Sequence, residues 1–193
     1  MAKSTIFRDV REAADGRELS LRWYRSKIKE LAPRMTAQGV MGQAPRDKIK
    51  PIPTYGMMNL YWYKPLNAAR LKYYDLFPLV IPFKKHRNGF TGLNMHYLSM
   101  GVRVQLLDRM KVYAEEEKLE VYWDLIGGIR QVRPIVRRYS AAQVQSLFLR
   151  IPLEDMLVGV LLPVQEFYKG EWGYKQRVAS RSVWYHTRKA INS

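Results

Sequence analysis

The 193-residue sequence contains no cysteine, and this absence excludes several kinds of site at once. A chain without thiols forms no disulfide, no thiolate zinc site and no iron–sulfur cluster, and it has no cysteine nucleophile. Histidine is scarce as well, because His86, His96 and His186 are scattered without the spacing of metal ligands. We therefore expect no metal and no cofactor.

Long hydrophobic runs are also missing. The longest strongly apolar stretch without a charge, residues 156–165, is about half as long as a membrane-spanning helix. Residues 1–16 alternate acidic and basic side chains and contain no apolar core of the kind found in signal peptides. The sequence therefore predicts neither membrane insertion nor export through a signal.

Negative charge is in short supply, since 17 Asp and Glu face 33 Lys and Arg and leave a net charge of +16. Such an excess usually neutralises a polyanion, and nucleic acid is the favoured one when a membrane is not expected. Hydrophobic residues make up 47% of the chain, which is enough for a core, so we expect a folded protein. The length suits one domain of ordinary size.

Residues 21–31 are predicted to form a helix that Pro33 ends. One face repeats apolar side chains at helical spacing, and another face is basic. The apolar stripe consists of Leu21, Tyr24, Ile28 and Leu31, and the basic face of Arg22, Arg25 and Lys29. That basic face either meets solvent or contacts phosphate groups, and the pattern does not decide between the two.

Residues 34–55 show no periodicity, and glycine and proline interrupt them repeatedly. Several basic side chains face a single acidic one, Asp47, in this stretch. We expect an extended basic arm that lies along nucleic acid or over a neighbouring subunit. The sequence thus predicts an N-terminal helix and extended arm over residues 1–55, followed by a single α+β domain with a C-terminal helix over residues 56–193.

The middle of the chain has the composition of β-strands. Three short apolar runs are typical of strands, at residues 57–63, 79–83 and 90–97. Asn88-Gly89 lies between the last two, and this dipeptide indicates a hairpin with a type I′ turn. Pro78 and Pro82 lack amide donors, so their strand should be an edge strand or contain a bulge. We expect three cations at the hairpin tip, Lys84, Lys85 and Arg87.

The remaining elements complete an α+β fold. Residues 99–118 return to helical periodicity, and residues 140–143 fit a capping box that opens a short helix. Two apolar runs, residues 147–151 and 158–164, are predicted to join the central hairpin, and residues 172–192 to form a terminal helix. We therefore predict a small antiparallel β-sheet or barrel flanked by helices, with the extended basic arm at the N-terminal side.

Motifs for catalysis are absent. No Gly-rich phosphate-binding loop and no Gly-x-Ser-x-Gly elbow occurs, so neither ATP-driven chemistry nor a common type of hydrolase is indicated. A nuclease needs carboxylates that converge on a metal ion, and the candidates lack a spacing that indicates such a site. These candidates are Asp75, Glu120, Asp124, Glu154, Asp155 and Glu166. We predict that the protein is not an enzyme, with a nuclease dependent on Asp124 or Glu166 as the third alternative.

Aromatic residues are abundant, with 13 Tyr, 6 Phe and 5 Trp. They could stack on unpaired bases, but packing in a core or a subunit contact is the commoner use. Because neighbouring strand residues point to opposite faces, Tyr61 and Tyr63 should share one side of their strand and Trp62 the other. We expect only one of these sides to be buried.

Two segments carry a resemblance to a known group of proteins. Residues 73–83 read YYDLFPLVIPF, and residues 88–98 read NGFTGLNMHYL after a polar turn. This pair resembles a strand pair of small virion proteins of contractile-tailed bacteriophages, and weaker similarity extends over roughly residues 57–167. Within that group the chain is similar to the DNA end protectors. The resemblance implies a protein that sits with the DNA terminus near the portal, completes the filled head and shields the injected end from exonuclease.

We accordingly predict a non-enzymatic virion protein, assembled in the host cytoplasm, that binds DNA through its phosphate backbone or its duplex end. Its other expected partners are portal, neck or tail subunits, and no membrane is expected. The predicted phosphate contacts are Lys84, Lys85, Arg87, Arg130, Arg133, Arg137, Arg138, Arg177 and Arg181. The alternative is a structural protein of the neck, tail or baseplate whose basic surface meets acidic subunits. Convergence of these cations on one surface would favour DNA, and scatter would favour assembly.

Overall fold

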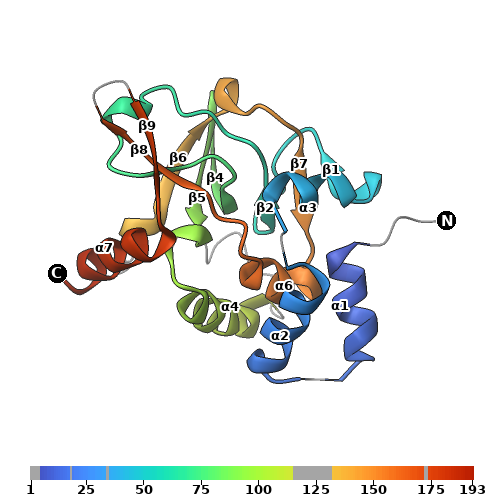
Figure 1. Ribbon diagram of the computed structural model, residues 1–193. Helices are drawn as coiled ribbons and strands as arrows, with labels where there is room; N and C mark the ends of the chain where they lie inside the picture. The colour runs from blue at the N-terminus through green and yellow to red at the C-terminus, as the bar shows by residue number, and fades with distance from the viewer. Residues whose placement is uncertain (1–4, 18, 34, 115–131, 172–173) are drawn as a thin grey trace.

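The computed structural model describes residues 5–17, 19–33, 35–114, 132–171 and 174–193 (Figure 1). Over these ranges the chain combines six α-helices with two antiparallel sheets, which confirms the predicted α+β class. The larger sheet has six strands and the smaller has three, and neither closes on itself. Of the two predicted forms, an open sheet is therefore right and a barrel is wrong.

The larger sheet brings together segments from most of the chain. Its strands lie in the order β1 (Ile49–Lys50), β7 (Phe148–Ile151), β2 (Met58–Leu60), β4 (Leu79–His86), β5 (Gly89–Asn94) and β6 (Val136–Ser140). The predicted strands near residues 57, 79, 90 and 147 are all confirmed. One face of this sheet packs on the main core, and the other carries a compact aromatic cluster around Tyr61.

The β4–β5 hairpin forms as predicted, but its turn differs from the expected type. The last strand pair is His86 with Gly89, and no positive φ occurs at Asn88, so the turn is not type I′. Gly89 has φ +154°, and a Cβ there would lie 1.9 Å from the Tyr139 carbonyl oxygen. Lys84 and Lys85 belong to paired positions of β4, which leaves only Arg87 of the three predicted cations in the loop itself.

Strand β4 is an inner strand, because β2 and β5 pair with its two edges. The register shifts between Pro82 and Lys84, so the strand accommodates proline by a bulge. Of the two explanations predicted for the prolines, the bulge is right and the edge position is wrong.

The smaller sheet joins β3 (Tyr74–Asp75), β8 (Phe167–Glu171) and β9 (Tyr174–Val178), and α7 (Ser180–Asn192) follows it. The predicted terminal helix is therefore wrong over residues 174–178. The reason is visible in the pairing, since Val178 faces Phe167 and packs on the core while exposed Arg177 lies beside it. A short 3-10 helix, η2 (Ala68–Arg70), lies against this sheet, and a Cβ at Gly170 would lie 2.3 Å from the Ala68 carbonyl oxygen.

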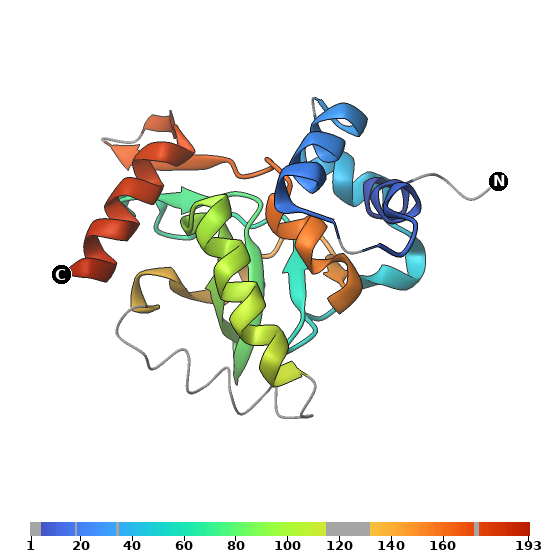
Figure 2. The ribbon, with the colours of Figure 1, turned by 90° about the horizontal axis from the view of Figure 1, so that it is seen from below.

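Helices α1 (Ile6–Ala14), α2 (Leu21–Leu31), α4 (Met100–Ala114) and α6 (Met156–Leu161) gather at one end of the larger sheet (Figures 1 and 2). The α2 prediction is confirmed, although Leu21 and Leu31 of its predicted apolar stripe are exposed. Helix α6 occupies residues 158–161 of a strand predicted over residues 158–164, and residues 162–164 form no strand. This run is buried as expected, but it packs as a helix against α2 and α4.

The N-terminal region contains more structure than expected. Thr5 caps α1, a helix that was not predicted, and Ile6, Phe7 and Val10 of α1 are buried. An extended basic arm is not confirmed in the described residues 35–55. That stretch forms α3 (Ala37–Gln43), the 3-10 helix η1 (Arg46–Lys48) and β1, which pairs with β7 of the larger sheet.

A buried polar network connects the two sheets with the helices. His96, in the 3-10 helix η3 (Met95–Tyr97), lies with its Nδ1 2.7 Å from Asp75 Oδ2. Arg103 of α4 donates to the carbonyl oxygens of Leu98, Val160 and His96. Trp184 of α7 also donates to the His96 carbonyl oxygen, at 2.9 Å, and thereby fixes the C-terminal helix on η3.

Candidate nucleic-acid interface

Eight of the nine predicted phosphate contacts lie within the described residues, and Arg130 lies outside them. Seven of the eight are exposed, and Arg137 is half-buried. None of these eight side chains forms an ion pair with a carboxylate in the part of the chain that the structure describes. No carboxylate of the described residues therefore prevents these eight side chains from binding an external anion.

The larger sheet places two of these cations in one row. Lys84 on β4 pairs with Thr91 on β5, and Thr91 pairs with Arg138 on β6. Paired residues of antiparallel strands point to the same face, so Lys84 and Arg138 flank Thr91 on one side of the sheet. His86 joins this row, because its Nε2 lies 2.7 Å from the Thr91 hydroxyl.

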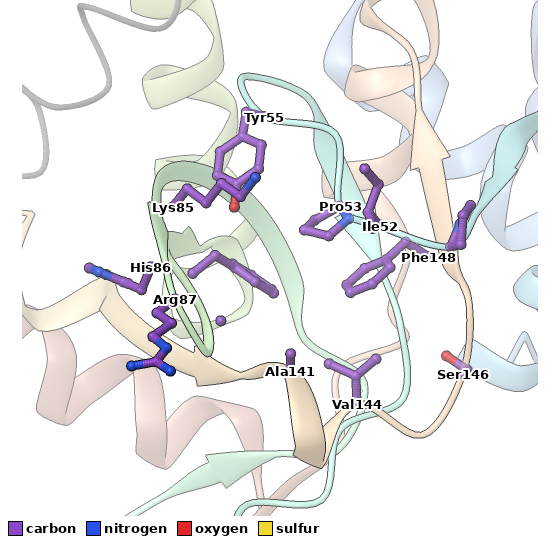
Figure 3. A pocket seen from close by; sticks show the side chains of 13 residues that line it. Ile52, Pro53, Tyr55, Lys85, His86, Arg87, Ala141, Val144, Ser146 and Phe148 are labelled. Carbon is purple, nitrogen blue, oxygen red and sulfur yellow. The ribbon is translucent and has the colours of Figure 1, made fainter.

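The opposite face of the hairpin has a hollow of about 370 Å³ (Figure 3). Lys85, His86 and Arg87 line it from the hairpin, and Ile52 and Pro53 line it from the segment after β1. Its floor is aromatic. Phe90 and Phe148 belong both to this lining and to the buried aromatic cluster, which consists of Tyr61, Tyr63, Val80, Phe90, Tyr139 and Phe148.

A second hollow, the terminal groove, lies where the segment before β3, the 3-10 helix η4 (Arg133–Ile135), β6 and α7 meet. Its volume is about 650 Å³, and an adjoining pocket of about 110 Å³ shares Leu71, Tyr73, Tyr97 and Arg137 with it. Among the described residues, no carboxylate lines this groove beside its lysine and its two arginines. The lining consists of Leu71, Lys72, Tyr73, Tyr97, Arg133, Pro134, Arg137, His186, Thr187 and Ala190.

Arg137 is held in place at the wall of this groove. Its Cζ lies 4.2 Å from the centroid of the Tyr97 ring, and its Nη1 donates to the Val136 carbonyl oxygen at 2.8 Å. Burial raises the pKa of Tyr97, and the nearby Arg137 acts in the opposite direction. Tyr97 is therefore a neutral support for the guanidinium at physiological pH.

Arg177 and Arg181 lie apart from the cations of the larger sheet. Arg177 on β9 pairs with Tyr168 on β8, which pairs with Tyr74 on β3. Arg181 is exposed on α7, whereas the buried side of that helix carries Val183 and Thr187. The predicted cations thus converge only in part. Lys84 and Arg138 lie on one face of the larger sheet, whereas Lys85 and Arg137 lie on the other, where Arg133 joins Arg137 at the terminal groove.

Many of the acidic side chains gather at the other end of the molecule. Asp155 lies 3.1 Å from Arg11, and Glu154 lies 3.9 Å from both Arg11 and Lys48. Burial raises the pKa of Asp155, and Arg11 opposes that effect. Helices α1 and α2 contribute two further pairs, Arg8 with Glu12 and Lys27 with Glu30. Ion pairs therefore neutralise several cations at this end, although the exposed basic face of α2 has no carboxylate partner among the described residues. No described carboxylate pairs with the cations of β4, β5, β6 and α7.

Within the described residues, the carboxylates that were candidates for a nuclease do not form a metal site. Asp75 is buried and accepts the Phe77 N–H while it contacts His96. Glu120 and Asp124 lie outside the described residues. The described residues contain no cluster of three or more His, Asp or Glu able to hold a metal ion. They also contain no helix long and apolar enough to cross a membrane.

The expected split of the aromatic strand is confirmed. Tyr61 and Tyr63 are buried on one side, and Trp62 is 45% exposed on the other. Sequence reasoning did not predict Lys72, Tyr73 or His186 as binding residues, although they line the terminal groove. The Tyr73-Tyr74 pair was the available signal, and Lys72 directly precedes it. Nothing local in the sequence connects this pair with His186.

The comparisons with known proteins give one result. Residues 8–187 match the family described as Phage T4 terminal DNA protecting protein. No curated protein and no solved structure matches the chain.

Proposed function

Because the chain belongs to the family of the Phage T4 terminal DNA protecting protein, we propose that it binds the ends of linear duplex DNA and shields them. The protection is steric: bound protein occupies the terminal nucleotides for longer than an exonuclease needs to engage them. No bond is made or broken in this function. The proposal therefore requires a cationic surface and a means of recognising an end.

One observation carries the DNA-binding part of this proposal. Lys84 and Arg138 lie in one row on one face of the larger sheet, and Arg133 and Arg137 line the terminal groove at its other face. No described carboxylate pairs with any of these four cations. Each phosphate that such a side chain neutralises releases condensed counterions, which makes the binding strong at low salt and independent of sequence. A protein that must hold any end of a genome benefits from both properties.

We further propose that the protein acts in the virion, after assembly in the host cytoplasm, and that it helps to complete the filled head beside portal, neck or tail subunits. Exposed apolar side chains support a protein contact. Ile52 and Leu66 are 70% and 77% exposed. One molecule could thus meet DNA with one surface and a neighbouring subunit with another.

The test compares a linear duplex with a closed circle of the same sequence. We expect fluorescence anisotropy to show tighter binding to the linear form, with steep weakening between about 50 and 200 mM salt. Prior binding should also slow digestion of the linear DNA by a processive exonuclease. Equal affinity for both forms would overturn end binding. Absence of binding at about 100 mM salt would favour the assembly alternative, in which acidic subunits meet the basic surface.

A further inference from the structure

The terminal groove has features that a phosphate-binding surface alone does not require. Besides Lys72, Arg133 and Arg137 it presents three rings, those of Tyr73, Tyr97 and His186. The Tyr73 and His186 ring centroids lie 5.7 Å apart at an interplanar angle of 34°. Both residues are half-buried, so each ring retains a surface that a ligand can reach.

The rings and cations are fixed relative to one another. Tyr97 donates its hydroxyl to the Tyr73 carbonyl oxygen at 2.8 Å, which holds the segment before β3 against η3. Arg137 lies on the Tyr97 ring, and its link to the Val136 carbonyl uses one of five guanidinium N–H groups. The remaining donors can serve a phosphate, which guanidinium groups bind in a bidentate manner.

The size of the groove excludes a duplex and admits a single nucleotide. A volume of about 650 Å³ falls in the range of pockets for small organic ligands, about 300 to 1,000 Å³. Bases in the interior of a duplex are stacked on both faces and offer neither face to Tyr73, and a base at a blunt end is still held by its partner. An unpaired nucleotide at a strand end can offer a free face, and its phosphate suits the excess of cations in the lining.

We propose that the terminal groove holds an unpaired nucleotide at the end of a DNA strand, with its base on Tyr73 and His186 and its phosphate on Arg133 and Arg137. This assignment rests on the proposed function and goes beyond it by naming what is recognised at the end. The hairpin cations Lys85 and Arg87 lie on the same side of the larger sheet as Arg137 and contact the adjoining duplex. The groove distinguishes an end from the interior, because only an end supplies a nucleotide that can leave the stack.

The experiment uses the full chain and two duplexes that differ only in a short unpaired tail. At about 100 mM salt we expect the tailed duplex to bind at least about fivefold more tightly than the blunt one, which is the effect of stacking one base. Tyr73→Leu should reduce this ratio to near one and leave blunt-end affinity within about twofold. Arg133→Gln, which also removes a proposed phosphate contact, should weaken binding of the tailed duplex more than binding of the blunt one and so lower the ratio. Arg133 is exposed, so its replacement tests the groove without disturbing the core.

Two variants serve as controls. Arg87→Gln, at the hairpin loop, should weaken binding to both duplexes equally. Arg25→Gln on α2 removes the same charge from the opposite end and should change neither affinity. A wild-type ratio near one, or a ratio that Tyr73→Leu and Arg133→Gln leave unchanged, overturns the assignment. Tighter binding to linear than to circular DNA would persist in that case, so the proposed function can survive when this inference fails.

Competition distinguishes the source of the ligand. A free deoxynucleoside monophosphate should displace the tailed duplex far less effectively than an unlabelled tailed duplex does, because it lacks the adjoining phosphates that Lys85 and Arg87 contact. Equal competition by the free nucleotide would make the groove a mononucleotide site. Equal competition by a poly-glutamate peptide would assign it to an acidic protein segment, and either result overturns the proposal.

Discussion

Arg103 is fully buried, and its guanidinium donates to three backbone carbonyl oxygens from two parts of the chain, residues 96–98 and Val160. Burial lowers the pKa of Arg103 to about 9, whereas the negative charge of Asp75 acts in the opposite direction. The side chain is therefore charged at neutral pH. It connects η3, α4 and α6, and it lies beside the Trp184 ring of α7, 5.6 Å from the ring centroid.

Replacing this arginine should be among the most destabilising single changes in the chain. Arg103→Ala leaves three carbonyl groups without their donor and creates a cavity, so we expect a loss of about 3 to 5 kcal/mol in the free energy of unfolding. Urea denaturation followed by circular dichroism measures it. Arg25→Ala, an exposed control, should stay within about 0.5 kcal/mol of the wild type. A loss below about 1 kcal/mol for Arg103→Ala would contradict this role.

His96 should make stability depend on pH. Burial lowers its pKa, although the adjacent Asp75 favours the charged form. The unfolded chain takes up the proton near pH 6.5, while the folded chain does so only at lower pH, so the free energy of unfolding falls as pH drops below about 6.5. His96→Asn keeps an N–H donor for Asp75 but cannot titrate. Urea midpoints between about pH 7.5 and 5 should decline less steeply in this variant, and parallel curves would refute the assignment.

At the scale of elements, the β4–β5 hairpin depends on one glycine. A Cβ at Gly89 would lie 1.9 Å from the Tyr139 carbonyl oxygen, and φ is +154° there. Gly89→Ala should therefore lower the free energy of unfolding by about 1 to 3 kcal/mol and loosen the pairing of β5 with β6. Gly101→Ala in α4, where nothing lies within 4 Å, is the matched control and should be neutral or stabilising. Equal stability of the two variants would show that the hairpin tolerates a side chain.

Some elements could be predicted from sequence because local signals determine them. The hairpin follows from Asn88-Gly89 between two apolar runs, and α2 follows from its helical spacing and Pro33. Helix α6 was missed because a short, wholly apolar run suits a buried strand or a buried helix equally well. Strand β9 was missed because its partner β8 decides its conformation.

In the candidate site, too, local sequence signals predict only the part that neighbouring residues form. Clustered arginines are visible in sequence, and Arg133, Arg137 and Arg138 lie close together because η4 and β6 are adjacent. The terminal groove also needs Tyr73 and His186, which are separated by most of the domain and meet only through tertiary packing. No local pattern could have joined them.

At the scale of the whole molecule, ion pairs among the described residues are unevenly distributed. Several charges of α1, α2 and η6 (Leu153–Asp155) are paired, whereas the cations of β4, β5, β6 and α7 have no carboxylate partner in the described ranges. DNA should therefore bind at the latter end. The triple variant Lys84→Gln, Lys85→Gln and Arg87→Gln should reduce the slope of log affinity against log salt by about 0.9 for each phosphate that these side chains neutralise in the wild type.

The matched control for this salt titration is on α2. Replacing Arg22, Arg25 and Lys29 with glutamine removes the same charge from one exposed helix face. We expect the salt slope of this variant to equal that of the wild type. If the α2 variant has a reduced slope and the hairpin variant does not, the basic face of α2 contacts the phosphates and the proposed orientation is wrong.

The close approach of η2 to Gly170 should affect which kind of DNA end the protein prefers. Ala68 and Ala69 rest directly on this glycine, and the chain runs on from them to Leu71 and Tyr73 at the groove. A methyl group at position 170 should lift that wall and misalign the Tyr73 ring, although no atom that meets DNA has been replaced. Gly170→Ala should therefore reduce the preference for tailed over blunt duplexes, although position 170 lies outside the groove. The affinity for blunt duplexes should stay as in the wild type.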